Sequence, residues 1–211
     1  MALKKFLARQ AYQPSGLFGS LIAGRAFNKT NGNLEDMALN QMPIRENSTI
    51  LEIGFGNGRL INKIGNQLQT GKIYGIEISK PMLAQAKKLN QKLIEQGVVE
   101  LQEGSIEQIP FEDHMFDVIV THNTIYFWPD PKNNIQEVLR VLKPGGSLYC
   151  GFRQEDQMKQ VTVMNQNRDI FKNLYSQERM EQFLSESGFK QVSTDHQKDK
   201  PLDNVLAVAR R

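Results

Sequence analysis

Hydrophobic positions along the chain alternate between two spacings, one typical of buried strands and the other of amphipathic helices. Strand-like apolar runs occupy residues 49–53, 73–78, 98–101, 116–121 and 147–152. Between them, apolar residues recur at helical spacing over about 58–69, from Ser79 to before Gly97, and from Asp130 onward. Strands that alternate with helices of this length predict right-handed crossovers and a mostly parallel sheet.

The helix expected after Ser79 has clear boundary signals. Ser79 is a favourable N-cap, and Pro81 fits the first helical turn. One face of this helix is expected to bury Met82 or Leu83, Ala86, Leu89 and Leu93. A stripe of this kind is typical of a helix that packs on a sheet.

The two ends of the chain depart from the alternation. Residues 1–47 are polar and interrupted by glycine and proline, with one helix expected near 33–42. Ser176 is expected to cap a helix that ends at Gly188. The last strands, near 189–194 and 204–209, have no helix between them and are expected to pair antiparallel. The pattern predicts a doubly wound α/β fold over 48–211, preceded by a helical segment over 1–47.

Composition limits the class of protein. The chain has 211 residues, 39% of them hydrophobic and 23% charged, which is typical of a soluble globular domain. The net charge of +3 is too small to indicate a nucleic-acid partner. The single cysteine, Cys150, excludes an intramolecular disulfide framework and a cysteine-based zinc cage, and favours a reducing, cytoplasmic compartment. We recognise no secretory signal and no apolar run of about 18 residues, so no stable membrane insertion is expected.

An apolar cluster in the N-terminal segment allows two interpretations. It lies near several lysines and arginines, and it fits either peripheral contact with a lipid surface or, as we favour, a helix that packs as a lid on its own domain. The cluster consists of Leu17, Phe18, Leu21 and Ile22.

The strongest chemical signal follows the first strand. The strand runs into Gly54, Gly56 and Gly58, and an amphipathic segment begins at once. Glycine has no Cβ, so the backbone approaches a ligand closely and its N–H groups are free to bind. Glu77 ends the second strand, where a carboxylate can accept hydrogen bonds from both hydroxyls of a ribose. The pair indicates a nucleoside-binding site.

Spacing separates the candidate nucleoside-binding folds. The three glycines are spaced Gly-x-Gly-x-Gly, whereas dinucleotide-binding folds use Gly-x-Gly-x-x-Gly. The sequence contains no Tyr-x-x-x-Lys pair, the usual catalytic couple of short dehydrogenases, and no Gly-Lys-Ser/Thr phosphate loop. A dehydrogenase therefore remains a weaker alternative.

The chain resembles the class I S-adenosylmethionine-dependent methyltransferases, and is most similar to their branch of quinone-biosynthesis and small-molecule enzymes. The matching segments cover roughly residues 48–153 in the family's order. They are residues 51–58 (LEIGFGNG), 75–79 (GIEIS), 104–105 (GS), 109–111 (IPF), 116–119 (FDVI) and 140–146 (RVLKPGG). The resemblance implies a Rossmann-like seven-stranded sheet with the last strand antiparallel, helices on both faces, and a lid formed by residues 1–47.

The resemblance also implies that S-adenosylmethionine is the cofactor. Gly54, Gly56 and Gly58 would hold its methionine half, and Glu52 would fix the loop or accept a hydrogen bond from the methionine ammonium. Glu77 would accept hydrogen bonds from the ribose hydroxyls, and the next residue, Ile78, would also contact the cofactor. The remaining residues expected at the cofactor are Ser105, Ile106 and Thr121.

Ser105 departs from the family pattern, because it stands where an acid often receives the adenine amino group. Ile106 would offer its backbone N–H and an apolar wall to the ring. Thr121 and His122 would border the methionine and the reacting methyl group. His122 is the nearest candidate for a general base, with a packed, hydrogen-bonding histidine as the alternative.

The loop after the fourth strand is expected to shape the acceptor pocket. We predict that Tyr126 faces this pocket as a second candidate catalytic residue beside His122, and that Phe127 and Trp128 pack against the next helix. Three polar residues are candidates to face the same space, with solvated surface as their alternative: Arg25, Asn28 and Arg153.

The sequence therefore predicts an enzyme that transfers a methyl group in line from S-adenosylmethionine to a small-molecule acceptor, without a metal. One alternative is a nucleic-acid or protein methyltransferase. The chain lacks the Asn/Asp-Pro-Pro-Tyr/Phe tetrapeptide that holds a flipped base, so no nucleic-acid partner is expected. Another alternative is a non-catalytic protein that binds S-adenosylmethionine. The sequence leaves the oligomeric state open.

Overall fold

The computed structural model describes residues 2–15 and 32–211. Its strands form a single seven-stranded sheet of order β3-β2-β1-β4-β5-β7-β6. Strand β7 pairs antiparallel with both β5 and β6, and the other pairings are parallel. This arrangement confirms the predicted sheet, including its antiparallel last strand. The strands are β1 (Thr49–Ile53), β2 (Lys72–Glu77), β3 (Val99–Glu103), β4 (Phe116–His122), β5 (Leu142–Phe152), β6 (Gln191–Gln197) and β7 (Asn204–Arg210).

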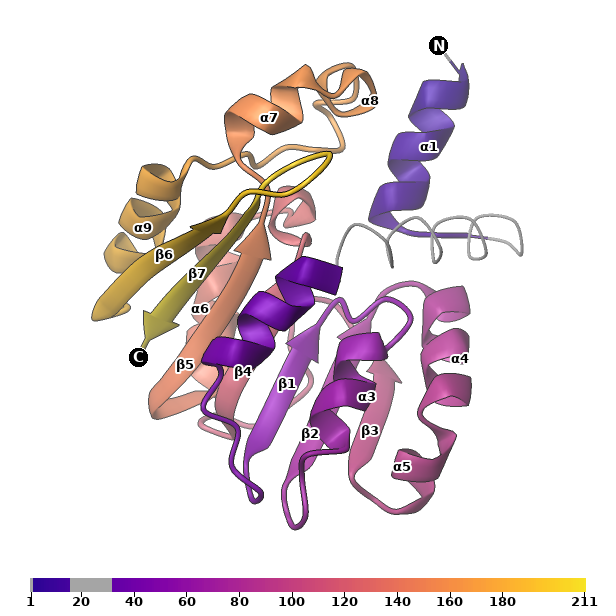
Figure 1. Ribbon diagram of the computed structural model, residues 1–211, viewed down its shortest axis with the longest axis vertical. Helices are drawn as coiled ribbons and strands as arrows, with labels where there is room; N and C mark the ends of the chain where they lie inside the picture. The colour runs from indigo at the N-terminus through magenta and orange to yellow at the C-terminus, as the bar shows by residue number, and fades with distance from the viewer. Residues whose placement is uncertain (1, 16–31) are drawn as a thin grey trace.

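Helices cover both faces of the sheet, as predicted (Figure 1). The helix over residues 32–41, α3 and α4 contribute to one apolar core, and α6 and α9 contribute to the core on the other face. The helices are α1 (Ala2–Tyr12), the unlabelled helix over 32–41, α3 (Arg59–Gly65), α4 (Lys80–Leu89), α5 (Gln91–Glu95), α6 (Pro131–Val141), α7 (Glu155–Gln160), α8 (Thr162–Asn165) and α9 (Gln177–Glu186), with a 3-10 turn η1 (Ile125–Phe127).

The helix that follows Ser79 is shorter than predicted. Ser79 does cap α4, but the helix ends at Leu89, whose side chain is 49% exposed instead of buried. The reason is Asn90, a buried residue whose Nδ2 donates to the carbonyls of Ala86 (2.9 Å) and Gly58 (3.1 Å). Asn90 thus takes the inward position one turn after Ala86, Leu89 lies outside that face, and Leu93 is buried from the separate helix α5.

The strand order reverses at β1. The chain proceeds from β1 to β2 and β3 on one side, and then places β4 and β5 on the other. At such a reversal the loops after neighbouring parallel strands diverge and leave a crevice at the carboxyl ends. Helix α1 lies beyond these carboxyl ends, beside α8 (Figure 1).

Some N-terminal predictions fall on residues 16–31, outside the described part of the chain. These concern Arg25, Asn28 and the apolar cluster Leu17, Phe18, Leu21 and Ile22. Within the described ranges, no helix combines the length and apolar character needed to cross a membrane.

Candidate active site

A cavity lies at the carboxyl ends of β1, β2 and β4, where the strand order reverses. It brings together eight of the predicted site residues and adds a wall from the N-terminal segment, formed by Ala11, Tyr12, Pro14 and Glu35. Gly58, Thr121 and Tyr126 are not among the described residues that line it. The eight predicted residues are Glu52, Gly54, Gly56, Glu77, Ile78, Ser105, Ile106 and His122.

Glu77 holds the glycine loop in place. Its Oε2 accepts from the backbone N–H of Gly56 at 2.9 Å, and its Oε1 accepts from that of Ser79 at 2.8 Å. Burial raises the pKa of this carboxyl, and the backbone hydrogen bonds partly oppose the rise. The side chain is only 6% exposed, yet it borders the cavity beside the loop.

Two glycines of the loop have different surroundings. Gly56 has a φ of +54°, and a Cβ built on it would meet no atom within 4 Å, so the backbone there borders open space. At Gly58, a Cβ would come within 2.8 Å of both Ala86 Cβ and Asn90 Nδ2. Gly58 therefore lets α3 and α4 pack closely and lies behind the cavity wall.

Glu52 is a buried acid with an unsatisfied oxygen. Its side chain borders the cavity and the residue is 4% exposed. Among the described residues, Oε2 has no hydrogen-bond partner. Burial, followed by the nearby charges of Glu35 and Glu77, raises the pKa of Glu52 well above its usual range. An oxygen of this kind requires a hydrogen-bond donor, which a ligand in the cavity would supply.

Glu35 is a lining residue that the sequence analysis missed. It comes from the helix over 32–41, and its Oε2 forms an ion pair with Lys63 Nζ at 3.2 Å. A sequence signal for it exists, because Glu35 shares a helical face with the buried residues Ala38 and Met42. An acid on an otherwise apolar face indicates a buried site.

The wall after β4 rests on a short hydrogen-bond network. Thr121 is fully buried, and its Oγ1 donates to the Ile53 carbonyl at 2.9 Å. It also bonds to Thr124 Oγ1, which accepts from Trp128 Nε1. Thr124 and Trp128 line the cavity, so Thr121 positions the wall from behind.

His122 lines the cavity and contains a buried nitrogen, Nε2, without a hydrogen-bond partner among the described residues. Burial, with smaller contributions from the charges of Arg153 and Lys63, lowers the pKa of His122 to about 4. The imidazole is therefore neutral near pH 7 and suited to exchange hydrogen bonds.

The aromatic residues after β4 take different places from those predicted. Tyr126 is 2% exposed and lies outside the described lining, with its hydroxyl donating to Asn123 Oδ1 at 3.1 Å and accepting from the Arg153 backbone N–H. Phe127 and Trp128, predicted to be packing residues only, line the cavity. Arg153 is buried, and it donates to the Leu202 carbonyl and to Asn204 Oδ1 instead of facing solvent.

The part of the cavity that follows β3 contains a second acid that the sequence analysis missed, Glu107. Ser105 and Glu107 both line it, and Ser105 Oγ lies 3.2 Å from Glu107 Oε2. A carboxylate therefore lies beside Ser105, two residues later in the chain. Its proximity to Ser105 was the available signal.

Comparisons with known proteins place the chain in a family. Residues 51–150 match the family model described as "Methyltransferase domain". The uncharacterised methyltransferase YdaC of Bacillus subtilis is 26% identical over 90% of this chain and 98% of its own. The putative methyltransferase YrhH of the same organism is 30% identical over 67% of this chain and 77% of its own. A demethylmenaquinone methyltransferase of Oceanobacillus iheyensis is 31% identical over 53% of this chain and 47% of its own.

A solved structure supports the same fold. A putative methyltransferase in complex with the Haloferax volcanii Trm112 methyltransferase activator superposes with a TM-score of 0.77 at 19% identity, over 88% of this chain and 92% of that one. The fold, the position of the cavity and the sequence relatives agree. The chain belongs to the class I S-adenosylmethionine-dependent methyltransferases, with relatives that include quinone-biosynthesis enzymes.

Proposed function

We propose that this protein binds S-adenosylmethionine in the described cavity and transfers its methyl group to a small-molecule acceptor. The observation that carries the proposal is the position of Glu77. A buried carboxylate at the end of β2 borders the cavity next to the exposed backbone of Gly56. This is the arrangement that a ribose requires beside a close backbone approach.

The charges of the cavity suit this cofactor. S-adenosylmethionine carries a sulfonium and an ammonium, and the described lining includes four acids but neither lysine nor arginine. Glu77 would bind the ribose hydroxyls and Glu52 Oε2 the ammonium, whereas Ser105, Ile106 and Glu107 would surround the adenine. When bound, the cofactor supplies a methyl group already activated by the positive sulfur. The chain then mainly has to position the acceptor and exclude water.

We assign residues 1–47 to a lid over the cofactor site. Two hydrogen bonds join this segment to the loop after β2: Gln13 Nε2 donates to the Ile78 carbonyl at 3.0 Å, and Ser79 Oγ donates to the Pro14 carbonyl at 2.6 Å. Together with the lining residues Ala11 and Tyr12, these contacts support a role in shielding the reaction from water.

The acceptor would bind between this lid and the turn after β4. The rings of Tyr12 and Phe127 lie 5.3 Å apart, centroid to centroid, and Trp128 continues the apolar wall. His122 would orient the acceptor through Nε2, and Tyr126 and Thr121 would position the wall without touching the ligand. A cavity bordered by these rings and the lid suits a small molecule better than a polymer.

Calorimetric titration with S-adenosylhomocysteine and with NAD tests the cofactor assignment. We expect binding of the first and none of the second. A library of small metabolites incubated with radiolabelled S-adenosylmethionine then tests the acceptor class. Binding of NAD alone would remove the proposed function, and cofactor binding without transfer to any acceptor would favour a non-catalytic role.

A further inference from the structure

We propose that Glu35 forms, together with Glu52, the binding site for the ammonium group of the cofactor. The inference rests on the proposed function and extends the cofactor site into the N-terminal segment. It makes the helix over residues 32–41 part of the ligand-binding machinery.

The two acids meet at the cavity from separate elements. Glu52 lies on β1 and Glu35 on the helix over 32–41, and both are buried, at 4% and 8% exposure. The two elements share one apolar core, in which Ile50 of β1 is grouped with Leu34 and Ala38 of the helix. Both acidic side chains line the cavity, and the charge of Glu35 acts on the Glu52 carboxyl.

Two oxygens of these acids, Glu35 Oε2 and Glu52 Oε2, lack a hydrogen-bond partner among the described residues. Lys63 Nζ lies 3.2 Å from Glu35 Oε2 and 2.7 Å from Asp36 Oδ1, and it donates its hydrogen bond to Asp36. Glu52 accepts from the backbone N–H of Ile61, and its Oε2 has no partner among the described residues. Buried carboxylates without a full set of donors are costly. An ammonium with three N–H donors would satisfy them.

The order of residues along the cavity indicates which ammonium this is. Ser105 and Glu107 lie after β3, Glu77 ends β2, and Gly54 to Gly56 follow β1. If Glu77 binds the ribose, the methionine half of the cofactor extends past the glycine loop. Its amino group would then lie near the Glu52 end of the cavity, where Glu35 closes the wall.

The test compares S-adenosylhomocysteine with its desamino analogue, in which hydrogen replaces the amino group. Both are titrated calorimetrically into the full chain. We expect Glu35→Gln to weaken S-adenosylhomocysteine about tenfold or more, as for the loss of a charge-assisted hydrogen bond, and to leave the desamino analogue unchanged within about twofold. The readout is a ratio of two affinities and needs no knowledge of the acceptor.

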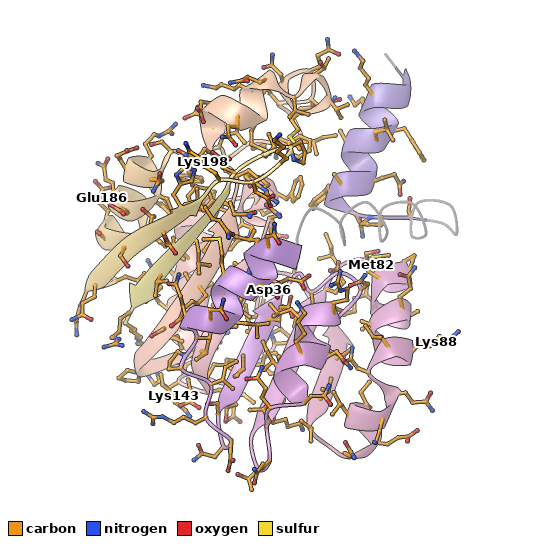
Figure 2. The ribbon with its side chains drawn as sticks, in the orientation of Figure 1. Asp36, Met82, Lys88, Lys143, Glu186 and Lys198 are labelled. Carbon is orange, nitrogen blue, oxygen red and sulfur yellow. The ribbon has the colours of Figure 1, made fainter. Side chains whose placement is uncertain are left out.

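Asp36→Asn is the matched control. Asp36 pairs with the same Lys63, but its side chain is 61% exposed and it is not a lining residue (labelled in Figure 2). We expect both ligands to bind this variant as they bind the wild type. If Glu35→Gln does not fold, the same ratio is measured on Glu35→Asp. Its shorter side chain should also lower the affinity for S-adenosylhomocysteine and leave that for the desamino analogue unchanged.

Three outcomes would overturn the inference: equal weakening of both ligands by Glu35→Gln, no weakening of either, or the same effect from Asp36→Asn. In each case, tight binding of S-adenosylhomocysteine to the wild type would leave the proposed function intact. Failure of the wild type to bind S-adenosylhomocysteine would instead overturn the proposed function itself.

Discussion

Glu77 Oε2 lies 2.9 Å from the backbone nitrogen of Gly56, so one buried carboxylate fixes the loop beside which we place the cofactor. Glu77→Ala removes the proposed ribose ligand and leaves the N–H groups of Gly56 and Ser79 without their acceptor. We expect it to weaken S-adenosylhomocysteine binding by about 1–3 kcal/mol, measured by calorimetry. Unchanged affinity in a folded variant would mean that the ribose binds elsewhere.

Glu52→Gln should stabilise the ligand-free protein. Folding raises the pKa of Glu52, so the folded state retains a proton that the unfolded state releases, and stability is lost as pH rises from the usual range through the raised pKa. The groups that act on this carboxyl are Glu35, Glu77 and the Ile61 N–H. A neutral amide removes this penalty, and we expect a gain of about 1–2 kcal/mol at pH 7.5, measured by urea unfolding.

The same variant should bind the cofactor product more weakly, since its amide no longer offers a full charge to the ammonium. The thermal shift produced by S-adenosylhomocysteine should therefore shrink while the ligand-free melting temperature rises. A variant that is no more stable than the wild type at pH 7.5 would contradict the assignment of Glu52 as a strained, ligand-directed acid.

His122 should make the protein sensitive to acid. Its folded pKa of about 4 lies below the ordinary value near 6.5, so the unfolded state gains a proton first as the pH falls. Its stabilising contribution is complete above about pH 6.5 and is lost toward pH 4. His122→Gln should flatten this part of the profile by up to about 2 kcal/mol between pH 7 and pH 5, measured by urea unfolding at both values.

His196→Gln is a useful control, because it changes an exposed histidine far along the chain. If the His122 and His196 variants have equal pH profiles, the His122 prediction is wrong. Once an acceptor is known, kcat/KM in the wild type should show no inflection from His122 above pH 6, since the imidazole stays neutral there.

Glu107 should contribute to recognition of the adenine amino group. We expect Glu107→Gln to reduce the preference for S-adenosylhomocysteine over its inosine analogue, which carries an oxo group in place of the amine, by about 0.5–1.5 kcal/mol. Ser105→Ala, which removes a partner of Glu107, should have a smaller effect. Calorimetric titration of both ligands measures the preference, and equal ratios in the wild type and the Glu107 variant would contradict the assignment.

The sequence predicted β1, β4 and β7 well because each carries an apolar run, whereas the polar strand β6 spans Gln191–Gln197 instead of the predicted 189–194. It failed at Leu89, because Asn90 takes the inward position and forms side-chain hydrogen bonds there that periodicity does not encode. The predicted places of Tyr126 and Phe127 are reversed in the structure for a similar reason: Phe127 lines the cavity and Tyr126 does not. The turn η1 directs the Tyr126 hydroxyl inward to Asn123 and leaves Phe127 facing Tyr12.

Within the site, the local motifs led to Gly56, Glu77 and Ser105, which lie in or beside matched segments of the sequence. Glu35 escaped notice because its place at the cavity depends on how the helix over 32–41 packs on the sheet, and that helix carries none of the matched motifs. Gly58 and Thr121 were placed at the correct strand ends, but they face neighbouring elements. Spacing along the chain does not specify which side of a loop faces a ligand.

The hydrogen bond from Ser79 to Pro14 has a thermodynamic consequence. Ser79 also donates its backbone N–H to Glu77. Two hydrogen bonds of Ser79 therefore connect Glu77, which we propose binds the ribose, to the N-terminal residues 2–15. If occupancy of the sugar site favours docking of residues 2–15 by a given factor, docking must favour occupancy by the same factor, because a coupling free energy is reciprocal. The rate at which a protease cleaves the N-terminal segment, measured over a range of ligand concentrations, would report this coupling free energy.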